Sequence, residues 1–110
     1  MNFQHKILAS GKWNELPLID QMANVGSEVD RAMKWREKGK NEISMRAFYR
    51  ALELLSLCKS DSKNKDRLKE LCRGYELLVD YFAGDNIYHS TDEQWRKYFY
   101  GFNYLARKGV

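Results

Sequence analysis

The sequence predicts an all-α protein, an antiparallel up-down bundle of four helices with a short N-terminal arm. Its 110 residues include one proline and seven glycines, the two residue types that most disfavour a helix interior. Apolar residues recur at steps of three and four, the spacing of one face of an α-helix, and no segment shows the strict alternation of a half-buried strand. Four such segments with short polar connections are typical of an antiparallel bundle.

The composition indicates one globular domain. Hydrophobic residues make up 44% and charged residues 31% of the chain, which are ordinary values for a folded protein of a size that supports one core. Lysine and arginine number 19 against 15 acidic residues, a net charge of +4. We predict an arm over residues 1–14 and the bundle domain over 15–110. Apolar residues of the arm, such as Phe3 and Trp13, are expected to lie on the domain or on a partner.

The first helix is predicted to start around Pro17, which a first helical turn tolerates, and to stop at Gly39 in a left-handed conformation. Gly26 lies inside this helix, where glycine costs about 1 kcal/mol relative to alanine. Close approach of another helix would explain it. The second helix is expected from Asn41, as N-cap, to about Lys59.

A polar segment over 60–64 predicts a chain reversal. The third helix is expected from Leu68 to Gly84. The fourth is expected from Thr91 to Arg107, opened by a capping box in which Ser90 and Glu93 satisfy each other's backbone N–H.

The apolar stripes of these helices predict the core: Leu18, Met22, Val25, Val29, Phe48, Leu52, Leu55, Leu71, Leu78, Phe82, Trp95, Phe99 and Phe102. Cys58 and Cys72 fall within the apolar patterns and are expected to be buried and reduced, although a bridge across a helical hairpin is an alternative.

Several classes of chemistry have no motif here. Gly-rich phosphate loops are absent, and His5, His89 and two cysteines are too few and too scattered for a zinc or di-iron site. We therefore assign no catalytic, cofactor-binding or metal-binding residue. His89 beside Tyr88 and after Asp85 is a candidate acid–base pair, with a surface-loop histidine as the favoured alternative. No apolar run approaches the roughly 18–20 residues of a membrane span, and the first ten residues lack a secretory signal, so we expect a cytoplasmic protein.

Charged residues on the helices are expected to form an interhelical ion-pair network. The alternative, a catalytic carboxylate, requires a raised pKa in a cleft. The residues concerned are Glu28, Asp30, Glu76 and Asp80 with Arg31, Arg50 and Arg73.

The fourth helix carries an unusual outer arc. It comprises Arg96, Lys97, Tyr100, Tyr104 and Arg107, opposite the core-facing side. Tyrosine and arginine concentrate at protein–protein hot spots, and the same residue types stack on bases and contact phosphates of single-stranded nucleic acid. An ordinary solvated face is the third interpretation. We favour a protein interface and expect a homodimer.

Three segments carry a family resemblance. Residues 22–32, 47–55 and 67–71 resemble those of small uncharacterised bacterial helical-bundle proteins, which are similar in size and helical plan to HEPN domains. HEPN domains often accompany minimal nucleotidyltransferases in toxin–antitoxin pairs. HEPN ribonucleases carry Arg followed after four to six residues by His, and neither His5 nor His89 has such an Arg. The resemblance thus implies a non-enzymatic interaction module, the helical partner of a nucleotidyltransferase-type protein.

Overall fold

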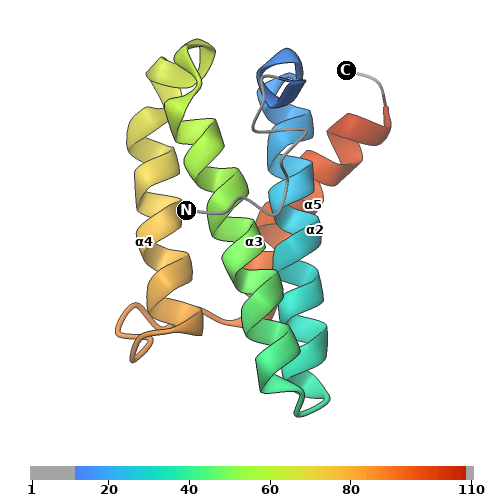
Figure 1. Cartoon of the computed structure of the whole chain (residues 1–110), viewed down its shortest axis with the longest axis vertical. Helices are drawn as coiled ribbons and strands as arrows, with labels where there is room; N and C mark the ends of the chain where they lie inside the picture. Colours follow the sequence, from blue (N-terminus) through green and yellow to red (C-terminus); the bar gives the residue numbers. More distant parts are fainter. Residues whose placement is uncertain (1–11, 109–110) are drawn as a thin grey trace.

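The structure is a computed structural model that describes residues 12–108, and within them the chain is all-α with no strand. The elements are η1 (Lys12–Glu15), α2 (Leu18–Glu37), α3 (Asn41–Ser60), η2 (Ser62–Arg67), α4 (Leu68–Phe82) and α5 (Asp92–Arg107), where η marks a 3₁₀ helix. The four α-helices run alternately up and down (Figure 1), which confirms the predicted four-helix bundle. Residues 1–11 of the predicted arm lie outside the described residues.

The helices pack unevenly. α3 lies along α2, α5 crosses the same helix from behind, and α4 packs on the other side of α3 (Figure 1). Contacts between α4 and α5 are few by comparison. The bundle is therefore open between its last two helices.

The end of α2 follows the sequence prediction. Gly39 has a φ of +75°, and its N–H donates to the carbonyl of Arg36 at 3.0 Å. The start of each helix differs slightly from the prediction. Pro17 lies immediately before α2, and Lys40 rather than Asn41 occupies the N-cap of α3.

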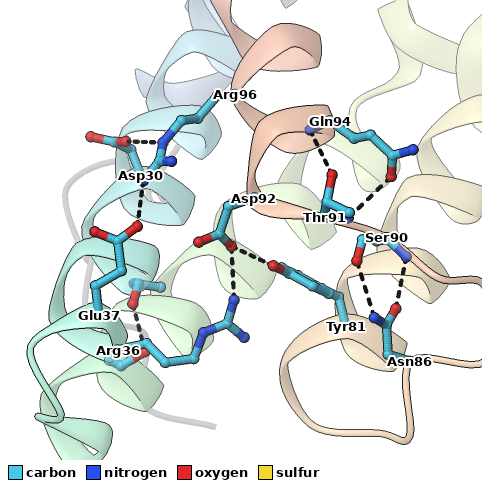
Figure 2. A network of polar contacts seen from close by, with 12 residues as sticks. Asp30, Arg36, Glu37, Tyr81, Asn86, Ser90, Thr91, Asp92, Gln94 and Arg96 are labelled. Carbon is cyan, nitrogen blue, oxygen red and sulfur yellow. Dashed lines mark hydrogen bonds and ion pairs between the residues drawn. The ribbon is translucent and has the colours of Figure 1, made fainter.

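The capping box of α5 lies one residue later than predicted. Thr91 Oγ1 accepts from the Gln94 N–H at 3.2 Å, and Gln94 Oε1 accepts from the Thr91 N–H at 3.1 Å (Figure 2). The predicted pair of Ser90 and Glu93 was wrong. Ser90 belongs to the preceding loop, because its backbone N–H and carbonyl both hydrogen-bond to the Asn86 side chain at 2.8 and 3.0 Å.

Nine predicted core residues are buried: Met22, Val25, Val29, Phe48, Leu55, Leu71, Leu78, Trp95 and Phe99. The other four are only half-buried and pack at the edge of the core: Leu18, Leu52, Phe82 and Phe102. Since α5 packs mainly on α2, the core is not enclosed on every side, and edge residues keep part of their surface. Trp13, which was expected in the arm, is a core residue with 1% exposure.

Gly26 occurs at a close approach of two helices, as predicted. A Cβ atom at this position would lie 2.8 Å from Phe99 Cβ, a distance at which something must shift. Glycine therefore lets α5 rest directly on the backbone of α2.

A buried polar cluster joins four segments at one end of the bundle. Gln21 Nε2 donates to the Trp13 carbonyl at 3.0 Å and to Asp61 Oδ2 at 2.9 Å. Asn64 Nδ2 donates to Gln21 Oε1 at 2.9 Å and to the Cys58 carbonyl at 3.1 Å. Each of these buried amides is thus partnered, and together they tie η1, α2, the end of α3 and η2 to one another.

Both cysteines are unbridged in the structure. Burial raises the pKa of the Cys58 thiol to about 12, which keeps it protonated and unreactive at neutral pH. Cys72 was expected to be buried but is only half-buried. It lies on α4, which packs against α3 but makes few contacts with α5.

Candidate functional site

The predicted arc on the last helix is an exposed surface of α5. Tyr100 is 66% and Tyr104 47% exposed, and their rings are stacked with centroids 6.3 Å apart and 26° between the planes. Lys97 and Arg107 are exposed beside them, and Lys108 Nζ lies 4.9 Å from the Tyr104 ring centroid. We call these five residues the tyrosine face.

Arg96 does not belong to this face in the way that the sequence suggested. Its Nη2 lies 3.0 Å from Glu37 Oε1, and its Nε lies 3.8 Å from Asp30 Oδ1 (Figure 2). The guanidinium therefore joins α5 to two carboxylates of α2. Helical periodicity placed Arg96 on the outer arc correctly, but the partner helix is a tertiary feature that periodicity does not report.

Lys97 is also paired, although weakly. Its Nζ lies 3.7 Å from Glu93 Oε1, one turn earlier in the same helix, and both side chains are largely exposed. Such solvent-exposed pairs contribute little free energy. Lys97 therefore remains available to an incoming partner, whereas Arg96 would have to break its contacts with α2.

A groove of about 400 Å³ adjoins the tyrosine face between α2 and α5. Its lining includes Gly26, Ser27 and Asp30 from α2, and Tyr100, Asn103 and Arg107 from α5. The tyrosine face thus borders a depression and is not a uniformly convex helix surface.

A second and larger groove, of about 630 Å³, runs between α4 and α5. We call it the α4–α5 groove. It is lined by Asp66, Arg67, Lys69, Glu70, Arg73, Gly74, Leu77, Ser90, Gln94, Trp95 and Tyr98. The sequence analysis missed this groove. No local signal identifies it, because it arises from two helices that do not pack together.

Tyr98 spans the α4–α5 groove. Its hydroxyl donates to Glu70 Oε1 at 3.2 Å and so connects α5 to α4. Burial, reinforced by the charge of and the hydrogen bond to Glu70, raises the pKa of Tyr98 to about 12. The phenol therefore stays neutral and acts as a donor across the physiological range.

The expected ion-pair network is formed only in part. Glu28 Oε2 accepts from Arg50 Nε at 2.7 Å, which joins α2 to α3 as predicted. Arg31 pairs with the same carboxylate from within its own helix, at 2.6 Å, so it is not an interhelical link. Arg73 lies over the Tyr88 ring with its guanidinium carbon 5.6 Å from the centroid.

Asp80 organises the loop after α4 instead of pairing with an arginine. Its two carboxylate oxygens accept from the backbone N–H groups of Ile87 and Tyr88, at 2.9 and 3.1 Å. The Asp80 side chain thus satisfies two backbone donors of this loop. His89 lies in this loop, exposed and with a φ of +55°, and no hydrogen bond found in residues 12–108 joins its imidazole to Asp85.

A partly buried network joins three helices near the start of α5. Asp92 Oδ1 lies 2.8 Å from Arg36 Nη2 and also accepts from the Tyr81 hydroxyl (Figure 2). The Arg36 guanidinium carbon lies 4.6 Å from the Tyr81 ring centroid. Burial and the Asp92 carboxylate raise the pKa of Tyr81. These contacts anchor α5 to α2 and α4 and fix its direction.

Within the described part of the chain, no three His, Cys, Asp or Glu side chains are grouped as metal ligands. No helix there is long and apolar enough to cross a membrane. Comparison with protein-family models, with curated proteins and with solved structures finds no match.

Proposed function

We propose that this chain is a non-enzymatic, cytoplasmic protein-interaction module that associates through the tyrosine face, forming a homodimer. The observation that carries the proposal is the stacked, exposed pair of Tyr100 and Tyr104 beside Arg107. Tyrosine and arginine are the residue types most enriched among side chains that dominate binding energy at interfaces. A two-fold interface would place the same pair on both subunits.

The rigidity of α5 supports this proposal. The helix is held by the ion pairs of Arg96 to α2, by the direct contact of Phe99 with Gly26 and by the Asp92–Arg36 pair. A surface that is already ordered before binding loses less entropy when a partner arrives. The adjoining groove between α2 and α5 offers a recess for a side chain of that partner.

Binding of single-stranded nucleic acid is the alternative, through Arg96, Lys97, Tyr100, Tyr104 and Arg107. One of the three predicted cations, Arg96, pairs with two carboxylates of α2. Its charge is therefore partly offset before any phosphate arrives. Since phosphate contacts supply most of the affinity for nucleic acid, the geometry favours the protein interface.

The test is the solution mass of the purified protein by light scattering. We expect a dimer at micromolar concentration, and we expect Tyr100→Ala or Tyr104→Ala to raise the dimer Kd by about tenfold or more, the effect of a hot-spot residue. Tyr49→Ala is the matched control, because Tyr49 is a 51% exposed tyrosine on α3. It should leave the mass unchanged.

Two outcomes would contradict the proposed homodimer. If the wild-type protein is a monomer at high micromolar concentration, it does not self-associate as proposed. A 260/280 nm absorbance ratio that is high at low salt and falls at high salt would favour the nucleic-acid alternative, because counterion release makes such binding salt-dependent.

The HEPN-like resemblance suggests a nucleotidyltransferase-type protein as a further partner. Co-expression with such a protein, followed by affinity purification, tests this assignment. Retention of the complex by wild type and by Tyr49→Ala, with loss in Tyr100→Ala, would place the partner on the tyrosine face.

A further inference from the structure

The α4–α5 groove has the dimensions and lining of a small-molecule site. Its volume of about 630 Å³ falls within the roughly 300–1,000 Å³ of known ligand pockets, which are mostly apolar with a few polar groups. Leu77, Trp95 and the ring of Tyr98 supply apolar surface along its length. The groove lies on the side of α5 that faces α4, away from the tyrosine face, so the inference below is independent of the proposed function.

Two details mark the groove as space that the protein itself leaves unfilled. No atom lies within 4 Å of a Cβ placed at Gly74, so the wall of α4 is open where a side chain would otherwise project. Trp95 is only 7% exposed, and its buried indole N–H has no hydrogen-bond partner in the described chain. The apolar ring of Trp95, and not this N–H, is the part that lines the groove and that a bound alkyl chain would cover.

The charges along the rim favour an anion. Arg67 and Glu70 pair with each other at 2.8 Å, which leaves Lys69, Arg73 and Asp66 as the remaining ionised groups of the lining. Lys69 and Arg73 are exposed and make no ion pair with a carboxylate in residues 12–108. Arg73 lies over the Tyr88 ring, which holds its guanidinium beside the mouth of the groove.

We propose that the α4–α5 groove binds an elongated apolar molecule with one anionic head group, of the class of medium-chain carboxylates. The apolar chain lies along Leu77, Trp95 and Tyr98, where it fills the space opposite Gly74. The carboxylate lies at the rim, within reach of Arg73 or Lys69. Burial of the chain supplies most of the affinity, and the arginine and lysine select the sign of the head group.

The experiment is calorimetric titration of the wild-type protein with dodecanoate below its micellar concentration. Dodecyltrimethylammonium, which has the same chain and a cationic head, is the matched probe for charge. We expect saturable binding of dodecanoate and binding of the cation that is weaker by about tenfold or more. Arg73→Gln should weaken dodecanoate binding by several-fold and narrow the difference between the two probes.

Gly74→Leu tests the location, because the leucine side chain would occupy the groove. Gly101→Leu is the control, since Gly101 is also a helical glycine with no atom within 4 Å of its Cβ but does not line the groove. We expect Gly74→Leu to lose dodecanoate binding by tenfold or more, Gly101→Leu to bind as wild type does, and both to give native circular dichroism spectra. Light scattering on both variants shows separately whether the homodimer is intact.

Three results would overturn the proposal. Absence of saturable dodecanoate binding by wild type would exclude a site for this class of ligand. Equal binding by Gly74→Leu would place the ligand elsewhere. Equal affinity for the anionic and cationic probes would show that the groove does not select an anionic head group. If the first of these results is accompanied by loss of the dimer in Gly74→Leu, the groove is assigned to a second copy of the chain.

Discussion

At the scale of single residues, Gly26 sets how closely α2 and α5 approach. Phe99 Cβ lies where the side chain of any other residue at this position would begin. Glycine in a helix interior costs about 1 kcal/mol relative to alanine, so the packing of α5 must more than offset that cost. Gly101 carries the same intrinsic cost without a neighbour to justify it.

Gly26→Ala is expected to destabilise the protein, whereas Gly101→Ala is expected to stabilise it. Overpacking costs roughly 1–3 kcal/mol against a gain in helix propensity of about 1 kcal/mol at Gly26, so the net destabilisation is up to about 2 kcal/mol. At Gly101 only the gain applies, up to about 1 kcal/mol. Urea unfolding measures both. A Gly26→Ala protein as stable as Gly101→Ala would show that α2 and α5 do not pack this closely.

At the scale of elements, the start of α5 depends on a loop that supplies its own hydrogen bonds. Asn86 adopts a φ of +53° and binds both backbone groups of Ser90 through its side chain. Because the Asn86 side chain holds the backbone of Ser90 in the loop, the helix begins one residue later. Thr91 is then the N-cap, and Gln94 is its partner in the capping box. The segment Ser-Thr-Asp-Glu-Gln contains two overlapping capping patterns, and the Asn86 contact selects the second.

Thr91→Ala should therefore cost about 1 kcal/mol of unfolding free energy, as expected for loss of a side-chain N-cap. Ser90→Ala should cost less than roughly 0.5 kcal/mol, the usual range for substitutions away from such features, because its hydrogen bonds to Asn86 use backbone atoms. Thermal or urea unfolding compares the two variants directly. If Ser90→Ala lowers the unfolding free energy more than Thr91→Ala does, the capping box is formed by Ser90 and Glu93, as the sequence predicted.

At the scale of the whole molecule, one buried carboxylate joins segments that are far apart in the chain. Asp61 accepts from Gln21 of α2 at 2.9 Å and from the Lys63 side chain, and the same Gln21 holds the carbonyl of Trp13. Burial alone would raise the pKa of Asp61, but the hydrogen bonds from Lys63 and Gln21 outweigh it and lower the pKa below its ordinary value of 3.8. The cluster thus closes one end of the bundle.

This lowered pKa predicts a loss of stability in acid. A carboxylate whose pKa is lower in the folded state contributes its stability fully above the ordinary value, and that stability declines as pH falls from there through the folded-state pKa. Asp61→Asn should cost about 1–3 kcal/mol at pH 7, as for a buried hydrogen-bond network that loses a charged partner, and much less near pH 2.

Asp66→Asn is the control for this prediction, because Asp66 is an exposed carboxylate on η2. Urea unfolding of both variants and wild type at the two pH values provides the comparison. A cost of Asp61→Asn that is the same at pH 2 and pH 7 would show that the carboxylate charge does not stabilise the cluster.

The helices, their approximate ends and most of the inward-facing residues can be predicted from the sequence. These properties are local: helical periodicity, the left-handed Gly39 and the absence of proline within the helices act within one segment. Gly26 is an exception, because its residue type also indicated a tertiary contact. Glycine has a low helix propensity, so its presence inside a helix suggests that another helix packs closely there. The positions of Tyr100 and Tyr104 on the outer side of α5 follow from the same periodicity.

Which helices pack together is a tertiary property, and most of the site follows from it. The pairing of Arg96 with Asp30 and Glu37 and the open α4–α5 groove both depend on α5 resting on α2 rather than on α4. The burial of Trp13 depends on η1 folding back onto α2, where Gln21 binds the Trp13 carbonyl. The physical reason is that helix-to-helix packing sums many weak contacts between residues distant in sequence. A stripe on one helix shows which side is buried but does not identify the helix that buries it.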